Sequence, residues 1–376
     1  MSINSNWVAA VKEDIPSERP LYAITPISKY IERFPTTRYY GSKRKLLPWI
    51  YECVKSLQFK TVLDAFGGTG SVSQLFRAMR KSVFYHDAFK FNADIAGAVL
   101  TNGASISRSD LLRLLDSVEL TQGTVANSFD GIFFLDVENR WIDGFMKTVV
   151  AAGVPAADES LLKYLMYQAC LKKRPFNLFH RSNLQLRTRT DVHRSFGNAT
   201  TWERSFREHM LECFDELMAS RDATLPPATI IPPGNVSSLE AGYDLVYLDP
   251  PYVVSSDRRN RDDYWRRYHF LEGLANYSKW NERIDWSSQI RQMSAPKHFT
   301  EWSRFQRFQE QLFALIESHR KSIVVLSYVK NAHPEDEVIR AFFEATFSRV
   351  SVHSTEHGHA LSATRKRELL FIGSPR

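Results

Sequence analysis

A strand–turn–helix–strand succession near the start of the chain most constrains its fold. Residues 60–66 (KTVLDAF) form a short apolar run that ends in a Gly-Gly-Thr-Gly turn. Residues 71–80 then carry apolar side chains at helical spacing, and residues 82–87 (SVFYHD) form a second apolar run. Two buried strands joined by one helix predict a βαβ unit, and a βαβ unit predicts a parallel sheet.

The same alternation returns late in the chain. Residues 243–249 (YDLVYLD) and 322–329 (SIVVLSYV) are apolar strands, and a helix is expected between them over 302–319. The remaining expected elements are a helix with Pro334 in its first turn, over 334–346, and closing strands over 347–353 and 368–372. The sequence therefore predicts an α/β fold of the Rossmann-like type, with a mostly parallel twisted sheet flanked by helices.

The middle of the chain is predicted to be largely helical. Three helices are expected there: 137–150 capped by Asp136, 159–173 capped by Asp158, and one opened by Thr200 with Glu203 and ending near 219. Residues 224–234 (TLPPATIIPPG) contain four prolines and are expected to be a linker back to the sheet.

These patterns predict four parts of the chain. They are an irregular N-terminal arm (1–35), the first part of the core (36–114), a helical insertion (115–238) and the second part of the core (239–376).

Positive charge is concentrated in the helical insertion. The chain carries a net charge of +7. Between Lys172 and His209, nine Lys and Arg residues stand against three acids, so this segment alone carries +6. Such a cluster predicts a polyanionic partner, and the alternative is a solvated basic face without one.

Composition excludes several classes of protein. No apolar run approaches the roughly 18 residues that a membrane helix needs, and the N-terminus lacks the apolar core of a signal peptide. The three cysteines have no metal-like spacing, so reduced thiols in a cytoplasmic protein are expected. His353, His357 and His359 lack a carboxylate-rich partner motif, so no metal is expected.

The glycine-rich turn predicts a nucleotide cofactor. Glycines after Asp64 let a ligand approach the backbone at a helix N-terminus, but such turns serve many cofactors. The spacing of a nicotinamide-binding motif is absent, because Gly70 is followed by Ser-Val-Ser. Asp87 ends the next strand, where an acid can accept hydrogen bonds from both ribose hydroxyls. An adenosine-type cofactor fits this pattern.

The sequence Asp249-Pro250-Pro251-Tyr252 follows an apolar strand directly. An exocyclic amine is a poor nucleophile, because its lone pair is delocalised into the ring. The Asp249 carboxylate and the Pro250 carbonyl can accept both of its N–H groups and so favour a tetrahedral nitrogen. The two prolines stiffen the turn. This motif resembles that of the S-adenosylmethionine-dependent amino-methyltransferases, especially those that methylate adenine N6 in DNA.

A third motif, Tyr39-Tyr40-Gly41-Ser42-Lys43, resembles the N-terminal motif of the same family, which usually has Gly where this chain has Ser42. The resemblance implies Asp249, Pro250, Pro251 and Tyr252 as catalytic residues, with Tyr252 stacking on an extruded base. It implies a site for S-adenosylmethionine, and for the product S-adenosylhomocysteine, made by Tyr39, Tyr40, Gly41, Lys43, Asp64, Phe66, Gly68, Gly70, Asp87 and Asp249.

The order of the motifs resembles the alpha group of adenine methyltransferases, in which the insertion recognises the target. Tail segments 268–272, 326–328 and 366–370 are also similar to that family. The resemblance implies double-stranded DNA as partner, contacted by Lys172, Lys173, Arg174, Arg181, Arg187, Arg189 and Arg194. It also suggests a cognate restriction endonuclease or other defence-system subunits as partners. RNA adenine, cytosine N4 and a non-catalytic nucleic-acid-binding module remain alternatives.

Overall fold

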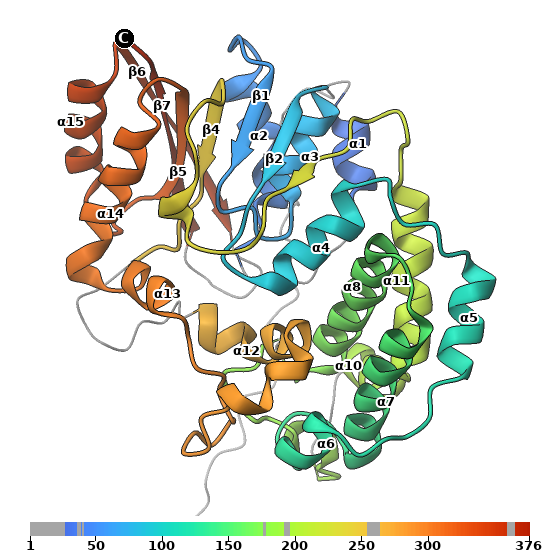
Figure 1. Cartoon of the computed structure of the whole chain (residues 1–376). Coiled ribbons are helices and arrows are strands. Elements are labelled where there is room, and N and C mark those ends of the chain that lie inside the picture. The colour runs from blue at the N-terminus through green and yellow to red at the C-terminus, as the bar shows by residue number, and fades with distance from the viewer. Residues whose placement is uncertain are drawn as a thin grey trace, which may run out of the picture.

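A mixed sheet forms the centre of the fold in the computed structural model (Figure 1). The structure describes residues 27–35, 39, 41–175, 178–191, 196–253, 264–358 and 365–376. Within them the sheet has seven strands in the order β3-β2-β1-β4-β5-β7-β6. Their bounds are β1 Thr61–Asp64, β2 Ser82–Tyr85, β3 Thr229–Ile230, β4 Leu245–Leu248, β5 Ile323–Val329, β6 Arg349–Gly358 and β7 Arg365–Ser374.

The sheet confirms the predicted fold class. β1 pairs in parallel with β2 and with β4, β2 with β3, and β4 with β5. β7 runs antiparallel to β5 on one side and to β6 on the other. The strand order reverses direction at β1 and β4, and in open α/β sheets ligands bind at such a switch point, outside the carboxyl ends of the strands.

Each continuous apolar strand is buried on both faces, as parallel sheets require. Leu245 and Tyr247 of β4 join the core on one face, while Val246 and Leu248 join the core on the other. Helices α14 (Phe305–Ser318) and α15 (Asp336–Thr346) supply the second core. The first core includes α2 (Leu47–Val54) and α3 (Ser71–Ala78), and continues without a break into the helical part of the chain.

Most of the remaining helices lie below the sheet and to its lower right, drawn in teal to yellow-green in Figure 1. They are α4 Lys90–Leu100, α5 Arg108–Asp116, α6 Thr124–Ser128, α7 Asp136–Ala152, α8 Ala156–Lys173, α9 Gln185–Thr188, α10 Phe196–Glu203 and α11 Phe206–Ser220. The boundary predicted between residues 114 and 115 falls inside α5. Helices α12 (Tyr264–Ala275) and α13 (Lys297–Trp302) lie beneath the carboxyl edge of the strands.

The predicted helix starts need correction. α7 begins at Asp136, so this residue is its first residue and not its cap. Asp158 lies inside α8 and accepts hydrogen bonds from the Ser105 and Ile106 N–H groups instead. The capping box of α11 is Ser205 with Glu208, because Thr200 and Glu203 belong to the separate helix α10. Equal spacing of cap-forming residues made the two candidates indistinguishable in sequence.

Three other segments differ from expectation. The arm contains helix α1 (Ser28–Arg33), whose flanking Ile27 and Phe34 are buried in the first core. The proline-rich segment 224–234 contains the edge strand β3, so it is part of the sheet as well as a link to it. The helix expected over 302–319 is α14, which begins at Phe305, and a separate helix, α13, precedes it. No helix within the described residues has the length and apolar character of a membrane span.

Candidate active site

The glycine-rich turn brings the chain close to the end of β2. Gly67 N–H donates to the His86 carbonyl (2.9 Å), and a Cβ at Gly67 would lie 2.1 Å from the Tyr85 ring. Gly70 has a φ of +74°, a conformation that favours glycine, and α3 begins at the next residue. The turn therefore needs glycine at both positions to enter the helix against Tyr85.

Asp87 closes this turn from the end of β2. Its Oδ2 accepts a hydrogen bond from Gly68 N–H (2.9 Å), and its Oδ1 accepts one from Phe89 N–H (2.8 Å). Burial raises the pKa of the Asp87 carboxyl, and its hydrogen bonds oppose this effect. Asp87 thus faces the cavity from a fixed position, with its backbone partners holding the glycine turn in place.

Asp64 lies at the end of β1, under the same turn. Its Oδ2 accepts a hydrogen bond from the Ser73 hydroxyl (2.7 Å). Burial raises its pKa to about 7, with the negative charges of Asp249 and Asp87 acting in the same direction and the Ser73 bond opposing them. The cavity therefore has several carboxyl groups that repel one another and favour a cationic ligand.

Asp249 follows β4 and faces Asp64 across the sheet edge. Its side chain is 18% exposed and lines the cavity. The Tyr252 hydroxyl donates to Asp249 Oδ1 (2.9 Å), and the Lys43 ammonium lies 3.2 Å from the same oxygen. Burial raises the pKa of the Asp249 carboxyl, Lys43 opposes that shift, and the nearby carboxylate of Glu368 adds to it. One oxygen of Asp249 is thus held by two donors beside the cavity.

Lys43 comes from the 3₁₀ turn η1 (Lys43–Leu46), far from β4 in sequence. The Ser42 hydroxyl accepts from Arg44 N–H and caps this turn, which is a local role for the serine that departs from the family pattern. The Lys43 ammonium donates to the Tyr252 hydroxyl oxygen (2.5 Å). Burial would lower its pKa, but the charges of Asp249 and Glu368 raise it above its usual value. Lys43 is therefore a buried cation.

One cavity joins these groups. Its wall includes most residues of the predicted site: Tyr39, Gly41, Lys43, Asp64, Phe66, Gly68, Asp87, Asp249, Pro250, Pro251 and Tyr252. Gly70 is not on the wall, because it lies behind the turn at the start of α3. Tyr40 lies outside the described residues, as does Arg194 of the basic set.

The cavity also contains residues that sequence reasoning did not assign to it. They are chiefly Phe89, Tyr264, His298, Phe299, Trp302 and Glu368. The rings of Phe89 and Phe299 lie 4.9 Å apart, and Phe66 meets Trp302 edge-on at 5.3 Å. No helix is expected from the sequence over 297–302, where α13 brings Phe299 and Trp302 to the site. Glu368 had a sequence signal, since it is an acid at the start of the apolar run ELLFI.

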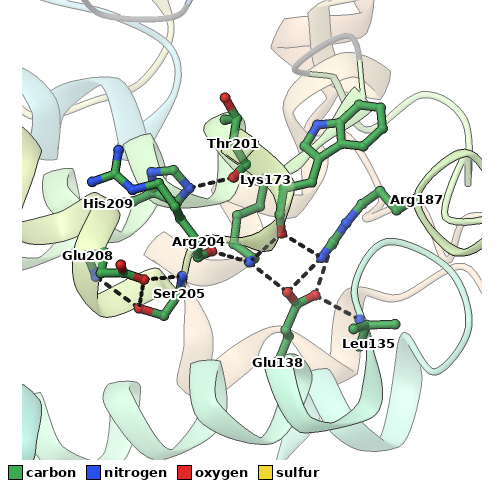
Figure 2. A network of polar contacts seen from close by, with 10 residues as sticks. Leu135, Glu138, Lys173, Arg187, Thr201, Arg204, Ser205, Glu208 and His209 are labelled. Atoms are coloured by element: carbon green, nitrogen blue, oxygen red, sulfur yellow. Dashed lines mark hydrogen bonds and ion pairs between the residues drawn. The ribbon is translucent and has the colours of Figure 1, made fainter. Parts of the chain in front are cut away.

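The basic segment is less exposed than its charge suggests. Figure 2 shows Lys173 and Arg187 converging on Glu138 of α7. Lys173 Nζ lies 2.8 Å from Glu138 Oε1, and Arg187 donates to both oxygens of Glu138 (2.9 and 2.7 Å). Lys173 also donates to the carbonyls of Trp202 and Arg204. The side chains of Lys173 and Arg187 are only 3% and 6% exposed, so the expectation that they face DNA is corrected.

Arg174 needs the same correction. It is 1% exposed, and its guanidinium donates to the carbonyls of Leu178, Arg181 and Ser182. Burial lowers its pKa to about 9. Lys172 is largely covered and pairs with Glu212 (2.8 Å). Arg181 and Arg189 are the exposed members among the described residues of this set, and Arg189 also pairs with Asp191 (2.7 Å).

No cluster of three or more His, Cys, Asp and Glu side chains suited to a metal occurs in the described part of the chain. His353 lies on β6, whereas the His357 side chain and His359 fall outside what the structure describes.

Comparisons with known proteins give a family and a relative that the chain resembles. The family model for D12 class N6 adenine-specific DNA methyltransferases matches residues 39–210, from Tyr39 through the glycine turn and Asp87 into α11. The chain is also 23% identical to the Type II methyltransferase M2.HphI of Haemophilus parahaemolyticus over 352 residues, which cover 90% of this chain and 98% of that relative. Both comparisons support an adenine-specific N6 DNA methyltransferase.

Proposed function

We propose that this enzyme transfers the methyl group of S-adenosylmethionine directly to N6 of an adenine that is turned out of double-stranded DNA. The observation that carries the proposal is the position of Asp249. Its carboxylate lines the same cavity as the glycine turn and Asp87, so an acceptor for the target amine and a site for an adenosine cofactor share one space.

The charges of the cavity fit the cofactor. Asp64, Asp87, Asp249 and Glu368 line it together with one Lys. S-adenosylmethionine carries a sulfonium and an ammonium group, and an excess of carboxylates favours both. Asp87 would accept hydrogen bonds from the ribose hydroxyls, and the backbone of the glycine turn would approach the cofactor closely. When bound, the cofactor supplies an activated methyl group.

The chain's own residues prepare the amine. Asp249 Oδ1 is held by Tyr252 and Lys43, which fixes the carboxylate with its second oxygen available to an N–H group. The Pro250 carbonyl would accept the other N–H group, and together they orient the nitrogen lone pair. Tyr252 would stack on the base. The N6 nitrogen gives up a proton after it is methylated, and Asp249, which would hold its N–H group, would receive it.

Replacing Asp87 by Ala is expected to weaken binding of S-adenosylmethionine and S-adenosylhomocysteine by roughly 10- to 100-fold, the usual cost of losing a hydrogen bond to a charged group. Calorimetric titration of both ligands measures the effect. Unchanged affinity would contradict the ribose role of Asp87.

A control is needed because Asp87 also holds the turn. Asp158→Ala provides it, since Asp158 is likewise buried and accepts from two backbone N–H groups (2.6 and 2.9 Å), but outside the cavity. Both variants should unfold at a lower temperature than the wild type. Only Asp87→Ala should lose cofactor affinity.

The substrate is tested by labelled methyl transfer. Duplex DNA, duplex RNA and single strands are offered with the labelled cofactor, and the products are digested to nucleosides. N6-methyl-2′-deoxyadenosine from duplex DNA, with no label in RNA, is the expected result. Label in RNA or on cytosine N4 would replace the proposal by one of those alternatives.

We also propose that the helical insertion contacts the DNA backbone through its exposed cations. Replacing both Arg181 and Arg189 with Ala should lower the salt dependence of DNA binding by roughly 0.9 in logarithmic slope for each phosphate that the variant no longer binds. Titrations of cognate and scrambled duplexes at several salt concentrations measure it. The same slope in the variant and the wild type would remove the support for this surface.

The biological setting is part of the proposal. The curated relative is named as a Type II methyltransferase, which supports a role in a restriction-modification system with a cognate endonuclease. Acting on DNA in the cytoplasm fits this role. Protection of DNA from an endonuclease encoded beside this gene would test it, and failure to protect would favour another role.

A further inference from the structure

A second buried carboxylate lies beside Asp249. Glu368 belongs to β7, between β5 and β6, and its side chain is 4% exposed. Its Oε2 lies 3.4 Å from the Lys43 ammonium and 3.4 Å from the Tyr252 hydroxyl. Both groups also contact Asp249 Oδ1. Glu368 therefore reaches Asp249 through two shared partners.

The charge balance of this group is unfavourable for stability alone. One ammonium stands between two carboxylates, which leaves an excess negative charge in a largely desolvated place. A buried charge is strongly destabilising unless it is well paired, and a single carboxylate would be enough to pair Lys43. A second one requires a different reason, and the chemistry of the site supplies it. During methyl transfer to a neutral amine, positive charge develops on the attacked nitrogen, and excess negative charge beside it lowers the barrier.

We propose that Glu368 is a positioning residue for methyl transfer. Because the Lys43 ammonium also pairs with Glu368, it neutralises the charge of Asp249 only in part. The Asp249 carboxylate therefore stays a strong acceptor for the target amine. With Lys43 held between two carboxylates, Tyr252 is fixed as well, because its hydroxyl accepts from Lys43 and donates to Asp249. This inference rests on the proposed function.

The pH dependence of the reaction should report this arrangement. The charge of Glu368 raises the pKa of Asp249, so its removal should lower that pKa. The other titratable groups facing Asp249 among the described residues are Lys43, Asp64, Tyr247 and Tyr252. Lys43 and the tyrosines do not titrate in the acid range. Asp64 is present in both the wild type and the Glu368 variant, so it does not account for a difference between them. The acid limb of the rate profile should therefore move to lower pH when Glu368 is replaced.

The experiment compares Glu368→Gln with the wild type in single-turnover methylation of duplex DNA. We expect the rate to fall by roughly 10- to 100-fold, as for loss of an interaction with a charged group. The KM for DNA should stay unchanged, and the acid limb of the rate profile should shift to lower pH. A wild-type rate, or a slow variant with an unshifted acid limb, would overturn the inference.

Two further variants separate positioning from a general structural effect. Glu356→Gln removes an exposed carboxylate that pairs with Arg367 on the same pair of strands (2.6 Å), and it should leave the rate unchanged. An equal loss in this control would overturn the inference. In a double-mutant cycle, adding Glu368→Gln to the Lys43→Met variant should not lower its methylation rate further, because Glu368 acts through Lys43. Fully additive losses would contradict that.

The outcome is also defined if Glu368→Gln does not fold. Glu368→Asp then replaces it, since the charge remains while the side chain is shorter. The methylation rate of Glu368→Asp should fall, while the acid limb of its pH–rate profile should stay close to that of the wild type. A wild-type rate would overturn the inference. Wild-type protein that methylates no DNA would instead refute the proposed function itself, so the two failures are distinguishable.

Discussion

Replacing Asp249 by Ala is expected to lower the rate of adenine methylation by at least about 10²–10³-fold, the cost of removing one acceptor that acts mainly in the transition state. The carboxylate is the group that can hold the target amine, and it is positioned by Tyr252 (2.9 Å) and Lys43 (3.2 Å). Without the Asp249 carboxylate, the charge of the Lys43 ammonium would be balanced by one carboxylate fewer. Its positive charge would then oppose the positive charge that develops on the amine.

Single-turnover methylation measures this effect, with DNA binding and thermal unfolding determined in parallel. Asp244→Ala is the matched control. Asp244 precedes the same strand at its opposite end and accepts from Lys60 and Thr61 N–H groups (2.8 and 2.9 Å), so its loss affects the sheet but not the cavity. Near-normal methylation by folded Asp249→Ala protein would refute the assignment of this site.

The parts of the fold that sequence predicts best are those fixed by local pattern. β1, the glycine turn, α3 and β2 follow from two apolar runs and the turn between them, because buried parallel strands are apolar on both faces. The order of Asp64, Asp87 and Asp249 at strand ends also follows, since the carboxyl ends of parallel strands meet at one edge. Their meeting in one cavity is a consequence of that topology.

The parts that sequence does not predict depend on contacts between distant segments. Lys43 and Glu368 are separated by 325 residues along the chain, and nothing local to either specifies the other. The charge of 172–209 is a similar case. Acids outside that window neutralise several of its cations: Glu138 pairs with Lys173 and Arg187, and Asp116 pairs with Arg207. A charge count over a window cannot identify partners that lie beyond it.

The largest expected effect on stability concerns Glu138. Its carboxylate is 12% exposed and lies between Lys173 and Arg187 (Figure 2). It also accepts from Leu135 N–H (3.0 Å) at the start of α7. Replacing Glu138 by Ala leaves two buried cations without their carboxylate, and breaking a buried pair in this way costs about 3–5 kcal/mol of unfolding free energy. Chemical denaturation of the variant and the wild type measures the difference.

Asp136→Ala is the matched control on the same helix. Asp136 is 53% exposed and pairs with Arg140 one turn away, and such surface pairs contribute about 0–1 kcal/mol. A loss in Glu138→Ala no larger than that of this control would show that Lys173 and Arg187 find other partners, such as the carbonyls of Trp202 and Arg204.

The stability provided by Glu138 should depend on pH in a defined direction. Burial acts to raise its pKa, but the hydrogen bonds and charges of Arg187 and Lys173 prevail and lower it below its usual value. A carboxyl group with a lower pKa in the folded state stabilises the protein fully above its unfolded pKa, and this contribution disappears as the pH falls through the folded pKa. The difference between wild type and Glu138→Gln should therefore be largest near neutral pH and shrink below about pH 4.3, the ordinary pKa of a glutamate.

A combined replacement tests what the network is for. Glu138→Leu with Lys173→Met and Arg187→Met removes all three charges together, and well-packed apolar substitutes for buried ion networks are often neutral or stabilising. We expect this triple variant to recover most of the stability that Glu138→Ala loses. It should also bind DNA with the wild-type salt dependence, because these cations are already engaged inside the protein. A reduced slope would mean that Lys173 or Arg187 leaves Glu138 for a phosphate when DNA binds.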